Sequence, residues 1–250
     1  GNVIRSQGDL ASAQAHFDAA LAIFQAGLGR DPRSVRWRRG RALVLIKVGQ
    51  LETARGDLPA AIARFRTAGE IADAVGAEHP DDRQLQDLRF TAHLQLGDGL
   101  SLQNSGAAAL AEFRQALAIA EALIAGAPDD LESQNDVFVV RDRIGMAKSA
   151  MGDSAGALAD LRANLTSMAG LAARDPTNVD WASNTAFGHQ QVGTTLLASG
   201  DTSGALAEHK AALAIWTDLA ARDGSSADRQ ENVAAGHINV GEALAAPGDS

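Results

Sequence analysis

The chain has 250 residues, of which 46% are hydrophobic and only 4% aromatic, and it contains no Tyr, a composition that favours packed helices over sheets. The absence of Cys excludes disulfides, thiolate catalysis and Cys-ligated metal sites. A formal charge of −9 argues against general nucleic-acid binding, and no apolar run approaches the roughly 20 residues that cross a bilayer.

These features set the first expectations about partners and location. We expect no cofactor, no metal, no nucleic acid and no membrane among the binding partners. The first residues lack the apolar stretch of a secretion signal, so we expect a cytoplasmic location.

A repeat of 48 residues runs through the chain and organises its elements. Its clearest column is glycine, at Gly1, Gly49, Gly97, Gly145, Gly193 and Gly241. A second column is mostly bulky, with Phe17, Phe65, Phe113, Leu161 and His209. A third holds Pro32, Pro80, Pro128, Pro176 and Gly224. Such a period predicts stacked copies of one unit, because a single copy cannot bury its apolar face alone.

Each copy is predicted to be a pair of antiparallel helices of about 20 residues each. The first helix begins at a Gly-Asp turn, such as Gly8-Asp9 or Gly56-Asp57, where the Asp side chain can cap the free N–H groups. The second follows the Pro column and begins near Ser34, Asp82, Asp130, Asn178 and Ser226. We call it the post-Pro helix.

In chain order, the pattern predicts a partial helix over 1–7 and then five helix pairs. Their boundaries are expected at about 8–55, 56–103, 104–151, 152–199 and 200–247. The prediction is a single all-α solenoid over 1–250. Its two ends carry no polar cap, so self-association through the ends is one expectation, and the role of an excised segment is another.

The columns resemble those of the tetratricopeptide repeat. The residues that carry the resemblance are Leu96, Gly97, Leu100, Asn104, Ala109, Phe113 and Ala116, and they recur as Val192, Gly193, Leu196, Gly200, Ala205, His209 and Ala212. The family period is about 34 residues, so this chain is similar to an elongated variant in which each helix gains about seven residues. The resemblance implies a right-handed superhelix and protein or peptide binding on its concave face, without catalysis.

The family's groove positions, carried over by their offset from the glycine column and extended along the helix, predict a binding face on the post-Pro helices. The predicted partner-binding residues are Arg36, Arg39, Leu43, Ile46, Asp87, Thr91, Leu94, Asp98, Val139, Asp142, Phe187 and Gln190. Around the first of them lies a basic cluster, made of Arg30, Arg33, Arg36, Arg38, Arg39 and Arg41. It suits an acidic peptide, although a solvated helix start would have the same composition.

The sequence contains few features typical of an active site. His93, His189 and His237 share one repeat column, but stacked repeats hold such residues about 8–10 Å apart, too far to share a zinc ion. We interpret them as polar residues at the helix seam, and we place His209, although it shares the bulky column, near the surface. No phosphate-binding loop, zinc-protease or serine-hydrolase motif is present.

The leading hypothesis is therefore a protein-interaction scaffold, by resemblance a segment of a larger bacterial signalling or regulatory protein. The alternatives are a structural spacer or self-association module and, more remotely, an enzyme.

Overall fold

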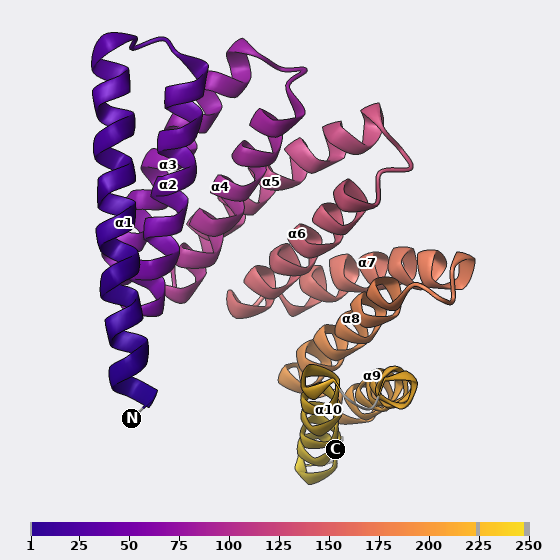
Figure 1. Cartoon of the computed structure of the whole chain (residues 1–250). Coiled ribbons are helices and arrows are strands. Elements are labelled where there is room, and N and C mark those ends of the chain that lie inside the picture. Colours follow the sequence, from indigo (N-terminus) through magenta and orange to yellow (C-terminus); the bar gives the residue numbers. More distant parts are fainter. Residues whose placement is uncertain (1, 224–225, 248–250) are drawn as a thin grey trace. The chain divides into compact units, whose positions relative to one another are not determined.

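The computed structural model describes residues 2–223 and 226–247, and side chains from Leu10 onward. Over this part of the chain, ten α-helices form and no strand does. The residues divide into two compact units, Gly1–Val137 and Phe138–Ser250, which we describe separately. Figure 1 shows short loops joining successive helices that run in opposite directions. The fold is an all-α helical-repeat solenoid.

The first unit contains α1 (Asn2–Arg30), α2 (Val35–Ala54), α3 (Leu58–Glu78), α4 (Arg83–Leu102), α5 (Gly106–Gly126) and the start of α6 (Leu131–Ala150). The second unit contains the rest of α6 with α7 (Ser154–Arg174), α8 (Val179–Ala198), α9 (Thr202–Arg222) and α10 (Ala227–Ala245).

The helix boundaries follow the repeat of the sequence. From α3 to α9 the first helices begin at Leu58, Gly106, Ser154 and Thr202, each 48 residues after the last. The post-Pro helices α2, α4, α6, α8 and α10 keep the same spacing. The prediction of an elongated two-helix repeat is thus confirmed.

The turn predicted at Gly8-Asp9 is the exception. Helix α1 runs from Asn2 to Arg30 without a break. Continuing α1 through Gly8 and Asp9 keeps one hydrogen bond per residue, which offsets the low helix propensity of these two residues. Gly1, Gly224 and the Gly248-Asp249 turn lie outside the described residues.

The internal Gly-Asp turns have the expected chemistry. Gly56, Gly152 and Gly200 have positive φ, between +82° and +93°, which glycine adopts without a steric penalty. The following aspartates cap the next helix; Asp57, for example, accepts a hydrogen bond from the Ala60 backbone N–H at 3.2 Å. At the substituted turn, Asn104 adopts φ of 59°, a region that Asn tolerates better than most residues.

The glycine column allows close contact between the two helices of a turn. A Cβ atom at Gly97 would meet the ring of Phe113 within 3.0 Å, and one at Gly49 would meet Phe65 in the same way. In the second unit, the partners are Leu161 for Gly145 and His209 for Gly193. Bulky side chains therefore pack directly on the backbone of the preceding helix.

His209 is buried, with 2% of its surface exposed, so its predicted position near the surface is wrong. It stands where other copies have Phe or Leu, and its ring fills the space above Gly193. Its Nδ1 atom is buried without a hydrogen-bond partner. Burial also lowers the pKa of His209, against the opposing influence of Glu242 and Glu208.

In both units, neighbouring helices pack in sequence, and one layer is packed more closely. In the first unit α2 contacts α4, and in the second unit α8 contacts α10. Among the described contacts, no pair of successive first helices, such as α1 with α3 or α7 with α9, meets in this way. The post-Pro helices are therefore the closer-packed layer of each unit.

We predict that Gly97→Ala destabilises the chain by about 1–3 kcal/mol, because the new methyl group displaces Phe113 from a packed site. Gly69→Ala is the matched control: it lies in α3, where an added Cβ would meet nothing within 4 Å. The higher helix propensity of Ala should leave this control neutral or up to about 1 kcal/mol more stable. Urea denaturation measures both, and equal effects would refute the packing argument.

We predict that His209→Phe stabilises the chain by about 1 kcal/mol, because an apolar ring replaces a buried nitrogen without a partner. The folded-state pKa of His209 lies below its unfolded value, so the unfolded chain takes up a proton first as the pH falls. The chain with His209 therefore loses stability as the pH falls below the unfolded pKa of His. The gain from Phe should therefore be larger at pH 5.5 than at pH 8. Thermal melts at both pH values provide the measurement, and a gain independent of pH would contradict this account.

Candidate functional site

An exposed stripe of basic and apolar side chains lies along α2. Arg36, Arg39, Leu43 and Lys47 follow one another at helical spacing, and all four are exposed. Leu43, in the middle, retains 47% of its surface. The Arg36 guanidinium lies over the Trp37 ring at 5.4 Å from its centroid. We call these four residues the basic stripe.

The other predicted arginines surround the end of this stripe. Arg30 and Arg33 are exposed, and Arg41 is half-buried. Arg38 differs, because its guanidinium donates hydrogen bonds of 2.8 and 2.6 Å to the carboxylate of Glu78. These bonds raise the pKa of Arg38 and neutralise its charge locally. Apart from Arg38, none of these arginines forms an ion pair within the described chain.

The predicted residues on α4 are half-buried. Asp87, Thr91, Leu94 and Asp98 each keep part of their surface, and the side chain of Gln50 on α2 donates to Gln95 on α4 at 3.0 Å. This bond ties the two post-Pro helices together beside the predicted face.

Arg83 gathers several carboxylates at the beginning of α4. Its guanidinium bonds Asp87 at 2.6 Å and Asp130 at 2.8 Å, and it lies 3.6 Å from Glu132. Burial and the nearby charges of Glu132 and Asp87 raise the pKa of Asp136 to about 6. The first unit thus changes from unpaired positive charge on α2 to excess negative charge beyond α4.

In the second unit, Phe187 on α8 is the most exposed of the predicted residues, at 40%. Its ring meets that of Trp216 on α9 edge to face, with centroids 5.0 Å apart. Val139 and Gln190 are half-buried.

Two of the predicted partner-binding residues are not accessible, which corrects that part of the prediction. Ile46 is 1% exposed, because α2 packs against both α3 and α4. Asp142 is 7% exposed, and one of its carboxylate oxygens has no hydrogen-bond partner. Burial raises the pKa of Asp142 to about 6, against the opposing influence of Arg143.

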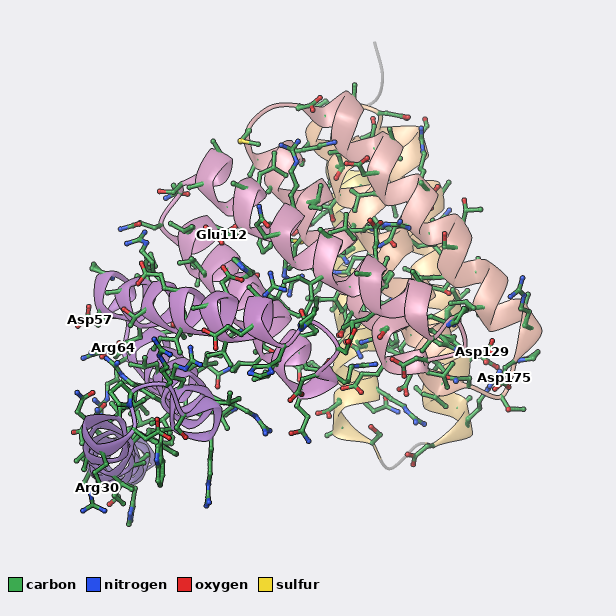
Figure 2. All side chains as sticks on the ribbon, turned by 90° about the horizontal axis from the view of Figure 1, so that it is seen from above. Arg30, Asp57, Arg64, Glu112, Asp129 and Asp175 are labelled. Carbon is green, nitrogen blue, oxygen red and sulfur yellow. The ribbon has the colours of Figure 1, made fainter. Side chains whose placement is uncertain are left out.

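Two members of the histidine column, His93 and His189, make seam contacts whose partners the sequence analysis did not name. His93 Nδ1 lies 2.7 Å from a Glu112 oxygen on α5, and its Nε2 lies 3.3 Å from Asp73 on α3. In the second unit, His189 bonds Glu208 in the same way at 2.6 Å. The constant offset of 19 residues between His and Glu was the available signal. Figure 2 shows Glu112 on its helix among the side chains of the first unit.

Burial lowers the pKa of His93, but hydrogen bonds in which the Asp73 and Glu112 carboxylates accept from its ring outweigh this effect and raise the pKa to about 9. The stability from this charged contact is complete below the unfolded pKa of about 6.5 and is lost as the pH rises through 9. We predict a loss of at most about 3 kcal/mol between pH 6.5 and pH 10. His93→Gln should flatten this dependence, as measured by denaturation across the pH range; an unchanged slope would rule out His93 as its source.

Among the described residues, no three His, Asp or Glu side chains are placed to hold one metal ion. None of the described helices combines the length and apolarity needed to traverse a bilayer.

No family model matches the chain, and no curated protein matches it in sequence. Solved structures do match. That of BtubC (BKLC) from P. vanneervenii has a TM-score of 0.67 and 18% identity, covering 94% of this chain and 83% of that chain. A putative kinesin light chain from P. anserina, with nearly identical TPR-like repeats, has a TM-score of 0.58 and 16% identity, covering 89% and 97%. The chain has the tetratricopeptide-like repeat fold. Within this fold, the glycine and bulky columns are scaffold, and the exposed post-Pro positions are available for contacts.

Proposed function

We propose that this chain is a protein-interaction scaffold that holds a peptide or protein segment on its post-Pro helices. The observation that carries the proposal is the contrast between columns. The glycine column keeps its residue type from copy to copy, whereas one exposed column of the post-Pro helices contains Arg36, Gln84, Glu132, Asp180 and Asp228. Selection for a particular ligand would vary such a column while preserving the packing beneath it.

The packing of the helices supports this choice of face. In each unit the post-Pro helices approach one another, while successive first helices do not. When paired helices stack, the more closely spaced layer lies on the inner side of the curve. Within each unit, the proposed concave side is therefore the one lined by the post-Pro helices, where a ligand could touch more than one repeat.

The charge of the first unit indicates which chemistry its part of the face prefers. The chain as a whole is acidic, yet Arg36, Arg39 and Lys47 have no acidic partner within the described residues. Unpaired positive charge beside an exposed Leu43 suits a segment with carboxylates around an apolar residue. The acidic groups near Arg83 would repel a long phosphate backbone.

We propose no catalytic role. The scaffold is, by resemblance, part of a larger bacterial signalling or regulatory protein, and a spacer or self-association module is the alternative. A self-associating module would show a mass above that of one chain in light scattering. A spacer would instead select no peptide in the experiment below.

The test is selection of peptides from a random display library on the purified chain. We predict that selected acidic peptides lose about tenfold or more in affinity on Arg36→Glu with Arg39→Glu, because both contacts become repulsive. The matched control is Arg66→Glu with Arg114→Glu, two exposed positions on the first helices α3 and α5. It should change affinity less than about threefold in fluorescence anisotropy. Failure to select any peptide, or equal loss in both variants, would refute the proposed function.

A further inference from the structure

We infer that the face of α8 and α10 in the second unit binds a basic segment with one large apolar side chain as its anchor. This inference rests on the proposed function and specifies the partner's chemistry at a second place. It stands on contacts of the second unit alone.

Phe187 provides the apolar contact. It is 40% exposed, yet its ring is fixed from below by the edge-to-face contact with Trp216. Trp216 is itself 2% exposed and belongs to a core cluster with Ala186, Ala212 and Leu219. An ordered aromatic ring on the surface loses little conformational entropy when a ligand covers it, which makes it an effective anchor point.

The neighbouring helix leaves this ring uncovered. Helix α10 packs against α8, and Ala235 is the α10 residue one repeat after Phe187. Ala235 is half-buried and too small to cover the ring. A side chain from a partner can therefore lie over Phe187 and against Ala235.

Negative charge surrounds this position. Asp180 lies two turns before Phe187 on the same side of α8, and Asp228 and Glu231 occupy the corresponding part of α10. All three are exposed, and none forms an ion pair within the described residues. The nearby cation, Arg229, is instead paired with Asp223 at 3.5 Å. The ligand must supply the missing positive charge.

The first unit carries the opposite charge at the same repeat positions. Arg36 corresponds to Asp180, and Leu43 corresponds to Phe187. Both units thus present an exposed apolar residue flanked by charged side chains. The flanking charge is positive in the first unit and negative in the second. Segments that suit the basic stripe should be rejected by the α8–α10 face, and the reverse should also hold.

The helix geometry sets the spacing expected in the ligand. Along the helix axis, Asp180 lies about 10 Å from Phe187, and Glu231 lies about 6 Å from the level of Ala235. An extended peptide covers about 3.3 Å per residue, so its basic side chains should stand two or three positions from the apolar anchor. A symmetric probe, Lys-Lys-Ser-Phe-Ser-Lys-Lys, satisfies this spacing in either direction.

The experiment measures binding of this labelled probe to the whole chain by fluorescence anisotropy. Replacing Phe in the probe by Ala should weaken binding about tenfold or more, because burial of that ring is lost. A probe with Glu in place of every Lys suits the basic stripe instead, so Phe187→Ala should leave its affinity unchanged. Phe187→Ala in the chain should also weaken binding about tenfold, with thermal melts confirming that the variant is folded.

Because Phe187→Ala also removes a packing contact with Trp216, a second variant tests the charges alone. Asp228→Asn with Glu231→Gln should weaken binding about threefold to tenfold and reduce its dependence on salt. The control is Asp218→Asn, an exposed carboxylate on α9 that pairs with Arg222. It should leave affinity unchanged.

Equal affinity of the basic probe for all variants, or an equal loss of the acidic probe's affinity on Phe187→Ala, would overturn the inference. If library peptides bind the basic stripe while this probe does not bind, the inference fails and the proposed function stands. If neither binds, both fail. Light scattering provides a last check: a dimer that Phe187→Ala dissociates would show that a second copy of the chain, not a basic peptide, occupies this face.

Discussion

The packing of a bulky side chain on a bare glycine backbone determines the geometry of this protein. Phe113 rests on Gly97 and Leu161 on Gly145, so the two helices meet more closely than any residue with a Cβ would permit. Because the partners are 16 residues apart across each turn between the paired helices, the same contact also fixes the turn and the register of the helices. The periodic helix boundaries follow from repeating this one contact.

Much of the architecture could be predicted from the sequence, because the repeat copies each local signal several times. The glycine turns, the aspartate caps and the lengths of the helices all depend on residues close in the chain. The turn at Gly8-Asp9 shows the limit of this reasoning. The same two residue types form a turn at Gly56-Asp57 but lie inside the continuous helix α1 at Gly8-Asp9.

The candidate face was less predictable than the fold. Helical spacing correctly placed Arg36, Arg39, Leu43 and Phe187 on exposed surface. It could not separate them from Ile46 and Asp142, because burial at the margin of a face depends on how closely the next helix approaches. The carboxylate partners of His93 were missed for a similar reason, since Asp73 and Glu112 belong to two different helices. Contacts across three helices leave only weak signals in one sequence.

The glycine contact has a lasting effect on how copies of the repeat diverge. A backbone surface accepts any side chain of suitable volume, so the partner column has drifted from Phe65 to Leu161 and even to His209. The glycine position tolerates less variation, because an added Cβ atom would overlap the partner side chain. Duplicated units joined in this way therefore inherit one rigid member and one tolerant member of each pair. The tolerant members can differ between copies, while the rigid members keep the copies recognisable.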